Sequence, residues 1–179
     1  EAPFLPHNAM EPMTFFADVR GDKIELIGPI QTPESTRKRV SDRLGVPEKN
    51  ISLMMPLMGG GFGRRLNGDF VVEAAMISKL AGVPVKLFYT REDDMTKGVY
   101  RPMVKSTYLA AIDKNGNLIG FHARGAGING GAVRQENFPS GAMENFLVES
   151  HQILSNVTTG AWRSPTHNYV GFAEQAFMD

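Results

Sequence analysis

The sequence of 179 residues predicts an α+β fold, in which helices pack against a mixed sheet. Two observations lead to this prediction. β-prone runs alternate with helix-like segments, and turn-forming residues separate neighbouring β-prone runs as they do in hairpins. A hydrophobic share of 42% is enough for one compact domain of this length, or for two very small ones. We expect a single domain over residues 1–179.

The first expected elements are a hairpin and a helix. Two β-prone runs within residues 13–27 flank a turn at residues 20–22, Arg-Gly-Asp. Thr32 then offers a capping hydroxyl and Pro33 a first helical residue, so a helix should follow and end at Leu44. This helix carries few apolar residues, which indicates that it is largely exposed.

A strand, a glycine-rich loop, a helix and a second strand should come next. Residues 51–55 are β-prone and lead into the sequence GGGFG at residues 59–63. Asp69 can cap a helix over residues 70–81, whose apolar residues surround nearly its whole circumference, so we expect it to be buried. Residues 85–89 give the second strand, and the two strands of this βαβ-like unit should share a sheet.

The second half of the chain begins with another expected hairpin. Residues 103–112 and 118–126 are β-prone and are joined by an Asn-Gly turn. Asn-Gly-Gly at residues 129–131 indicates a tight passage of the backbone. We expect a helix over residues 140–153 and the opening of another over residues 171–179, so the chain resembles a part excised from something longer.

The composition excludes several classes of function. Lys and Arg number 19, as do Asp and Glu, so the net charge of zero gives no broad attraction for nucleic acid. No apolar run approaches the ~20 residues that a membrane span requires. The absence of cysteine excludes disulfides and thiolate metal ligands, and the four histidines show no metal-ligand spacing, so we expect no protein-ligated metal. The compartment stays open, with bacterial cytoplasm and periplasm both compatible.

The glycine-rich loop is the main candidate for chemistry. Ordering each glycine costs roughly 0.5–1 kcal/mol, so a folded protein keeps four of them within residues 59–63 where the backbone needs unusual angles or close approach. Such a loop before a helix can turn main-chain N–H groups towards an anion or an oxygen-rich ligand, and Arg64 and Arg65 could add charge. The alternative is a packing turn with two solvated arginines. Neither common nucleotide-binding glycine pattern is present.

Other candidates are weaker. His7 and Glu11 stand between prolines near the start of the chain, where His7 is more typical of a surface or structural residue than of a catalyst. Trp162 and Arg163 adjoin in a turn-prone segment, which is also typical of a core tryptophan beside a surface arginine.

Several motifs, in order and with compatible spacing, resemble the molybdenum-binding large subunit of the xanthine dehydrogenase and aldehyde oxidase family. Within it, the isoquinoline 1-oxidoreductase beta-subunit group is the most similar. The resemblance rests on PHNAMEPM at residues 6–13, Gln31, LGVP at 44–47, MGGGFGRR at 58–65, LAGVPVKLFYTREDDM at 80–95 and GAWRSPTHN at 160–168. The chain would then be a molybdopterin-cofactor-binding domain from a larger subunit.

The resemblance implies a molybdenum-pterin cofactor, in its cytosine dinucleotide form, whose metal is held by the pterin and by no protein side chain. Gln31 would hydrogen-bond a ligand of the metal, as the catalytic residue of this segment. The cofactor would contact residues Gly60, Gly61, Phe62, Gly63 and Arg163. The isolated chain should hold no cofactor tightly.

The resemblance also implies a reaction and partners. A water-derived oxygen would enter a carbon–hydrogen bond of an aldehyde or an N-heterocycle, with the rest of the large subunit and a separate 2Fe–2S subunit completing the enzyme. The family's catalytic glutamate segment has no match, so the isolated chain should be inactive. Leu66 and Pro165 replace a glutamate and an aromatic residue of purine-hydroxylating members, which favours a less polar substrate pocket.

Two other functions remain open. The chain can be a non-catalytic scaffold or interface domain that exposes an apolar face. Alternatively, the glycine-rich loop can bind phosphate or a nucleotide.

Overall fold

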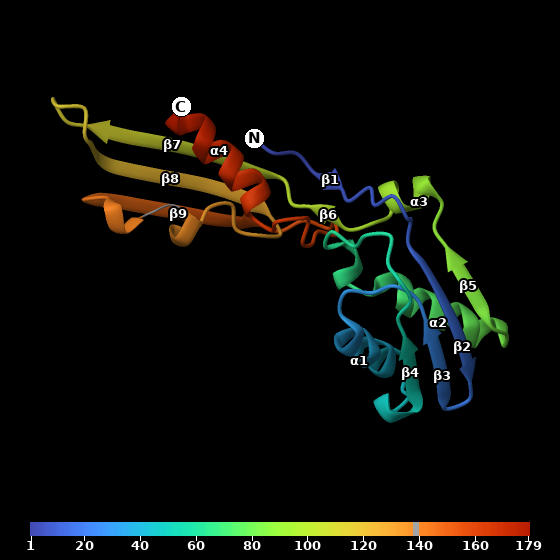
Figure 1. Cartoon of the computed structure of the whole chain (residues 1–179). Coiled ribbons are helices and arrows are strands. Elements are labelled where there is room, and N and C mark those ends of the chain that lie inside the picture. Colours follow the sequence, from blue (N-terminus) through green and yellow to red (C-terminus); the bar gives the residue numbers. More distant parts are fainter. Residues whose placement is uncertain (138–139) are drawn as a thin grey trace. The chain divides into compact units, whose positions relative to one another are not determined.

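The computed structural model describes residues 1–137 and 140–179, which form two compact units (Figure 1). Pro6–Gly98 make up one, called here the inserted unit, while Glu1–Leu5 and Val99–Asp179 together make up the split unit. Each unit combines a sheet with helices, and this confirms the predicted α+β class. The single domain expected over residues 1–179 stays a prediction.

The inserted unit is built on a four-stranded mixed sheet. Its strands are β2 (Thr14–Arg20), β3 (Lys23–Ile27), β4 (Ile51–Met54) and β5 (Val85–Phe88), in the order β4-β3-β2-β5. β2 is antiparallel to β3 and to β5, and β3 is parallel to β4. The first predicted hairpin is therefore confirmed. The two strands of the βαβ-like unit share the sheet as expected, at its opposite edges.

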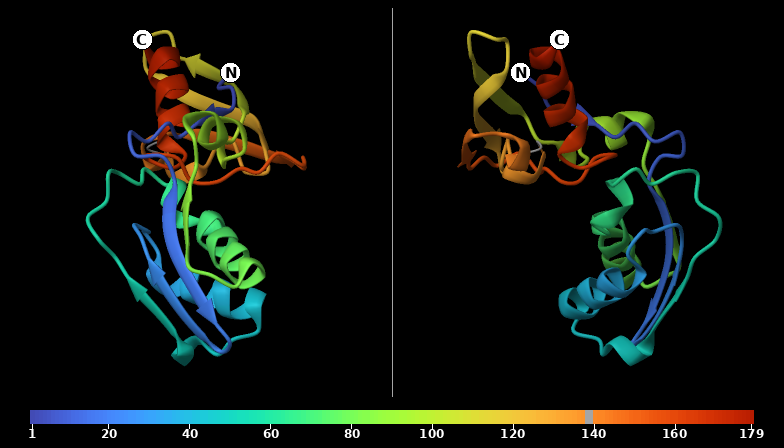
Figure 2. Two further views of the ribbon diagram at one scale, coloured as in Figure 1. Left: turned by 90° about the vertical axis from the view of Figure 1, so that its right-hand side faces the viewer. Right: turned by 60° about the vertical axis from the view of Figure 1, so that its left-hand side comes forward.

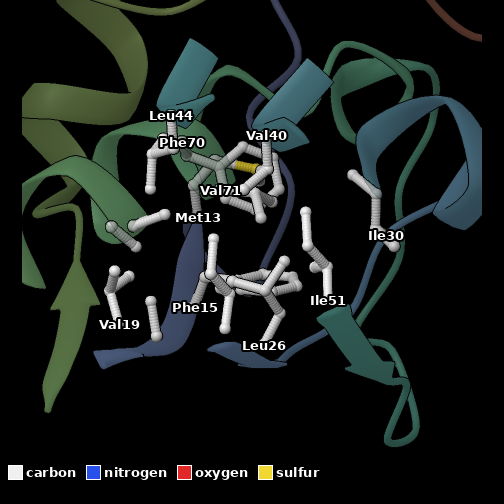
Figure 3. Packing of buried hydrophobic residues seen from close by; sticks show 14 of the residues in the cluster. Met13, Phe15, Val19, Leu26, Ile30, Val40, Leu44, Ile51, Phe70 and Val71 are labelled. Atoms are coloured by element: carbon white, nitrogen blue, oxygen red, sulfur yellow. The ribbon is translucent and has the colours of Figure 1, made fainter. Parts of the chain in front are cut away.

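Helices α1 (Pro33–Leu44) and α2 (Asp69–Ala81) cover one face of this sheet (Figure 2). Strand β2 alternates, so that Phe15, Ala17 and Val19 point into the core beneath the helices. The rings of Phe15 and Phe70 meet edge to face with centroids 5.8 Å apart (Figure 3). This apolar core holds the ends of β3 and β4 in place. The chain continues from these two ends to Gln31 and to the glycine-rich loop.

The structure corrects two details of α2. Its N-cap is Gly68, in a left-handed conformation, and Asp69 makes no capping hydrogen bond. The helix is also buried on one side only, because the sheet and α1 pack against one face, and Leu80 is 83% exposed. The prediction of a helix buried all round was therefore wrong. The largely exposed α1 agrees with its sequence, since its buried residues are Thr36, Val40 and Leu44.

The split unit contains a three-stranded sheet. Strands β7 (Val104–Ile112) and β8 (Leu118–Ile128) form the second predicted hairpin, and β9 (Asn145–Ile153) runs parallel to β8 at the edge. Helix α4 (His167–Met178) packs its Phe177 ring against Tyr108 and Phe121 of the sheet. Short strands β1 (Leu5–Pro6) and β6 (Tyr100–Arg101) pair with each other.

The helix expected over residues 140–153 was wrong. Most of this segment is β9, in register with β8, and the ring of Phe146 stacks on that of Phe121 at 5.9 Å. Phe146 and Val148 alternate towards the core of the split unit, so the pairing with β8 overrides the local sequence preference. The last helix, α4, begins at His167, before the segment from which it was expected.

The remaining elements are short. Helix α3 spans Arg91–Thr96, and 3₁₀ turns span Glu48–Asn50, Arg64–Leu66, Gln135–Asn137 and Ser140–Ala142. Across the described residues, every helix is too short or too polar to cross a bilayer.

Candidate functional site

The glycine-rich loop joins β4 to α2 and turns sharply. Gly60 and Gly63 both have φ of +95°, and Phe62 has φ of +52°, a left-handed angle that few residues other than glycine adopt. A Cβ atom on Gly60 would lie 2.4 Å from the ring of Phe62. Glycine is therefore needed at residue 60 for both its backbone angle and its contact, as the sequence predicted for the loop.

Gln31 lies directly against this loop. Its side-chain oxygen accepts a hydrogen bond from the main-chain N–H of Gly63 at 3.0 Å, and its own main-chain N–H donates to the carbonyl of Arg65 at 3.0 Å. A Cβ on Gly61 would come within 2.5 Å of the Gln31 side-chain oxygen. Among the residues that the structure describes, no acceptor pairs with the side-chain amide nitrogen of Gln31, which is exposed.

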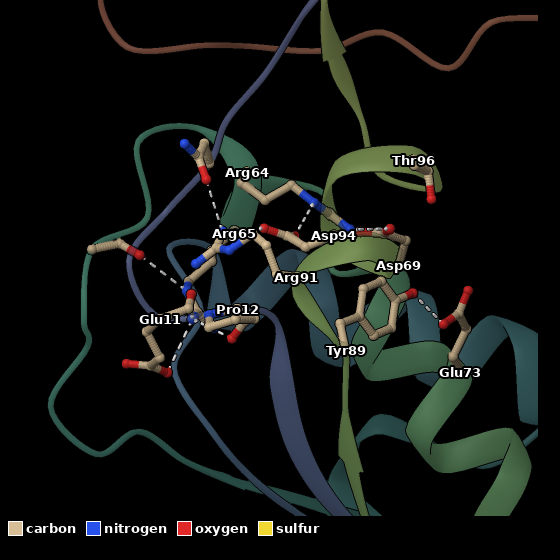
Figure 4. A network of polar contacts seen from close by, with 12 residues as sticks. Glu11, Pro12, Arg64, Arg65, Asp69, Glu73, Tyr89, Arg91, Asp94 and Thr96 are labelled. Carbon is tan, nitrogen blue, oxygen red and sulfur yellow. Dashed lines mark hydrogen bonds and ion pairs between the residues drawn. The ribbon is translucent and has the colours of Figure 1, made fainter.

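Arg64 and Arg65 are buried, which corrects the alternative of two solvated arginines. Arg64 donates two hydrogen bonds to the carboxylate of Asp69, at 2.7 and 2.9 Å, and its Nε lies 3.8 Å from Asp94 (Figure 4). This ion pair occupies Asp69, the residue that the sequence suggested as a helix cap. Carboxylates inside the fold therefore balance the charges of both arginines, and these charges are not available to a ligand.

Arg65 joins three segments that are distant in sequence. Its guanidinium donates to the carbonyl of Gly60 at 3.1 Å, to that of Pro29 at 3.2 Å and to the carboxylate of Glu11 at 3.0 Å. Burial lowers the pKa of Arg65, and the nearby Glu11 carboxylate opposes that shift. We call Glu11 and Arg65 the loop clamp, because they connect the start of the chain, the strand that leads to Gln31 and the glycine-rich loop.

Glu11 completes this clamp through its second oxygen. That oxygen accepts the main-chain N–H of Gly59 at 2.7 Å, and a Cβ on Gly59 would lie 2.4 Å from it. Sequence reasoning did not identify this role. The sequence contains only indirect signals for it: a carboxylate in a proline-bounded motif, and two adjacent arginines after a run of glycines. The contact between this carboxylate and an arginine depends on the tertiary fold.

Two further groups pack beside the clamp. The carboxyl of Asp94, in α3, is buried, and burial raises its pKa while Arg64 and Arg91 oppose that shift. The phenol of Tyr89 donates a short hydrogen bond to Glu73, and burial raises the pKa of Tyr89 well above its ordinary value. Charged partners therefore hold both groups, Arg64 and Arg91 in the case of Asp94 and Glu73 in the case of Tyr89.

The loop also contains two main-chain donors that point to a ligand. Among the described residues, no acceptor pairs with the N–H of Gly60 or of Gly61, and Gly61 is buried. A buried N–H without an acceptor costs free energy, so such a pair of donors is typical of a surface that receives oxygen or sulfur acceptors from a ligand. Together with the amide nitrogen of Gln31, they form a neutral, donor-rich set that fits an oxygen-rich cofactor.

The other predicted site residues are placed as follows. Leu66 is half-buried beside the loop, and its carbonyl accepts the hydroxyl of Thr32 at 2.8 Å. Arg163 and Pro165 belong to the split unit and are exposed, next to Trp162. The structure therefore brings Gln31 together with Gly60, Gly61, Phe62 and Gly63 in the inserted unit. In the described parts of the chain, no group of three or more His, Asp or Glu residues could hold a metal ion.

Comparison with known proteins relates this geometry to a family. The family model described as the molybdopterin cofactor-binding domain matches residues 1–163. The membrane-bound aldehyde dehydrogenase (pyrroloquinoline-quinone) of Gluconacetobacter polyoxogenes is 40% identical over 106 residues, which are 58% of this chain and 14% of that protein. Isoquinoline 1-oxidoreductase subunit beta of Brevundimonas diminuta is 38% identical over 69 residues, 38% of this chain and 9% of that subunit.

Solved structures agree on the fold. The aldehyde oxidoreductase of Desulfovibrio gigas superposes with a TM-score of 0.75 at 17% identity, covering 99% of this chain and 22% of that one. This chain therefore spans only a small part of the length of the proteins that it matches.

Proposed function

The chain belongs to the molybdopterin cofactor-binding domain family, and on that premise we propose that it holds a molybdenum-pterin cofactor within a molybdenum hydroxylase. One observation of the structure supports this proposal: the N–H groups of Gly60 and Gly61, for which no described residue provides an acceptor, lie in the same loop that Gln31 contacts. These N–H groups carry no charge, which suits a cofactor site, because neutral donors can orient an oxygen or sulfur ligand of a metal without replacing that ligand.

Each residue then has a defined part. Gln31 uses its side-chain oxygen to hold Gly63 and keeps its amide nitrogen for a ligand of the metal. The main chain of Gly60, Gly61, Phe62 and Gly63 would approach the cofactor, and Arg163 is proposed as a further cofactor contact. When bound, the cofactor supplies the redox metal that takes up the electron pair of the oxidised substrate.

The substrate proposed is an aldehyde or an N-heterocycle, hydroxylated at carbon with oxygen from water. The names of the two sequence relatives, an aldehyde dehydrogenase and an isoquinoline oxidoreductase, support this class. Leu66 and Pro165 would line a pocket of low polarity. We propose the cytosine dinucleotide form of the cofactor on the same grounds of resemblance.

The partners proposed are the rest of a large subunit and a separate 2Fe–2S subunit that carries electrons away. The small share of its relatives that this chain spans supports the first of these. The catalytic glutamate of the family would also come from another segment of the large subunit.

Replacement of Gln31 by alanine tests this assignment in the full subunit purified with its partner. Turnover should fall about 10- to 100-fold, because the metal ligand loses its donor, while molybdenum and pterin per subunit stay near the parent value. Gln175→Ala, at an exposed position of α4, is the matched control. Unchanged turnover in Gln31→Ala would remove the assigned role, and a clean parent preparation without molybdenum would remove the function.

One observation favours a second candidate, an interface domain. The segment that leads into the glycine-rich loop exposes large apolar side chains, with Leu57 99% exposed and Met54 64% exposed. Such a patch is typical of a surface that another protein segment covers. Light scattering of the 179-residue chain should then show self-association that Leu57→Ser reduces, whereas a strict monomer at high concentration would contradict it. A phosphate site at this loop loses support, since Arg64 and Arg65 are buried and paired.

A further inference from the structure

Strand β9 forms one edge of the sheet in the split unit, and among the described residues no further strand pairs with its outer side (Figure 1). It has nine residues, which exceeds the usual strand length of about five or six, and it contains no proline and no lysine, two residues that commonly protect sheet edges. Leu147 and Ile153 are 53% and 51% exposed. A long edge strand with exposed apolar side chains is typical of a surface that pairs with another strand.

The main chain of β9 contains a set of groups that face away from β8. Ile153 accepts the N–H of Asn129 at 2.8 Å, so every second residue counted back from Ile153 directs its N–H and C=O groups to β8. The residues between them, which include Val148, Ser150 and Gln152, direct theirs outward. Among the described residues, none takes up these outward groups, since the connection before β9 binds the side-chain hydroxyl of Ser150.

A second copy of β9 fits these outward groups. Two antiparallel copies related by a two-fold axis at Ser150 place the outward groups of Val148 opposite those of Gln152 in the other copy. Each outward N–H then meets an outward C=O, so the two copies can exchange main-chain hydrogen bonds along the edge. The residues between these pairs form the non-hydrogen-bonded pairs, whose side chains lie closest in an antiparallel ladder.

The side chains of those closest pairs are complementary. Glu149 lies opposite His151 of the second copy. Leu147 lies opposite Ile153, and both pairs occur twice because of the two-fold symmetry. Glu149 binds His122 through Oε2, whereas its Oε1 has no partner among the described residues and can accept from the imidazole. An axis one residue earlier would place Glu149 opposite itself, and an axis one residue later would place His151 opposite itself.

We propose that β9 pairs antiparallel with β9 of a second copy of this chain, so that the sheets of two split units become continuous. The inference uses no residue of the candidate cofactor site, and it holds whether or not the chain binds a molybdenum-pterin cofactor. The surface also differs from the apolar patch around Leu57, which belongs to the inserted unit.

Sedimentation equilibrium of the 179-residue chain tests this pairing, with Leu57→Ser present throughout to reduce association through the apolar patch. This background chain should form a dimer. His151→Glu should raise the dissociation constant of the dimer at least about tenfold, because carboxylates then face each other twice. Glu149→Lys should also weaken the dimer, since it removes both carboxylates that face the imidazoles. An equimolar mixture of the two variants should restore association, because each variant supplies the charge that the other one lacks.

Thr107→Glu is the matched control, because it adds a carboxylate to the same face of the sheet but on β7, at the opposite edge. It should leave the dissociation constant unchanged, and circular dichroism verifies that all variants fold. A background chain that stays monomeric, or a mixture that does not restore the dimer, overturns the proposal. Full subunits that do not pair through β9 would also overturn it and would assign this edge to a strand from elsewhere in the subunit. None of these results bears on molybdenum loading, so the two proposals fail separately.

Discussion

Arg65 is the residue on which the geometry of the loop depends most. It is 0% exposed and uses its donors on carbonyls and on the carboxylate of Glu11, which in turn holds Gly59. A lysine could not replace it, because a single ammonium cannot reach acceptors on three segments in the planar arrangement that a guanidinium provides.

Replacing Arg65 by methionine should destabilise the chain by about 3–5 kcal/mol, since the buried carbonyls and Glu11 would lose their donors. Urea denaturation measures this loss. Arg37→Met, which removes an arginine paired with Glu34 on the surface of α1, should cost at most about 1 kcal/mol. Similar losses in the two variants would contradict the role of the loop clamp.

Replacing Gly61 by valine should displace Gln31, because the new Cβ would lie 2.5 Å from its side-chain oxygen. Molybdenum and pterin content of the full subunit should fall at least about tenfold, whereas the far-ultraviolet circular dichroism should stay close to that of the parent. Gly82→Ala is a useful comparison, because a side chain strains its left-handed backbone but no atom of the described residues lies within 4 Å of its Cβ position. Equal loss of fold and of cofactor in Gly61→Val would make the loop structural only.

At this scale the sequence predicted the glycine-rich loop and its need for unusual backbone angles. Through the resemblance it assigned Gln31 to a ligand of the metal, which stays a prediction, and it did not predict the hydrogen bond between Gln31 and Gly63. It did not predict that Arg64 and Arg65 are buried. Asp69 is a local partner of Arg64, whereas Glu11 and Asp94 come from segments on either side of the arginines, and only the tertiary fold brings those two carboxylates to them.

Among the elements, α2 shows how composition can mislead. Its apolar residues surround the helix, yet only the side that faces the sheet and α1 is buried, with Phe70 near its start. Local turn residues predicted the two hairpins, and Pro33 predicted the start of α1. The capping hydroxyl expected at Thr32 was wrong, because this hydroxyl donates to the carbonyl of Leu66 and makes no capping hydrogen bond. Strand β9 was missed, because its conformation depends on parallel pairing with β8, and no local signal encodes that pairing.

Shortening one apolar side chain on each side of α2 tests whether only one side of the helix is buried. Phe70→Ala should cost about 3–5 kcal/mol, because it leaves a cavity in the core beside Phe15. Leu80→Ala, in the same helix but on its exposed side, should stay within about 0.5 kcal/mol. Urea denaturation of both variants provides the measurement. A large loss at Leu80 would instead mean that another surface covers this side in solution.

Over the whole molecule, three tyrosines should make stability depend on alkaline pH. Burial raises the pKa of Tyr89 in the inserted unit, and of Tyr108 and Tyr169 in the split unit, above the ordinary value of 10.0. The unfolded chain then releases these protons at lower pH than the folded chain does. Their contribution to stability is complete below about pH 10 and is lost as the pH rises through the raised values.

The urea midpoint should therefore decline between about pH 9 and about pH 11. In Tyr89→Phe the decline should be shallower, because one of the three protons no longer takes part. A midpoint that stays constant over this range, or an equal decline in the variant, would contradict the assignment.

The division into an inserted and a split unit also orders the events of biosynthesis. Ala2 and Val104 exchange main-chain hydrogen bonds of 2.8 Å. The ribosome synthesises all of Pro6–Gly98 after Ala2 and before Val104. At typical elongation rates, this interval lasts on the order of 5–20 s, far longer than a small sheet needs to form. The inserted unit can thus fold co-translationally, while Ala2 waits for a strand that has not yet been made.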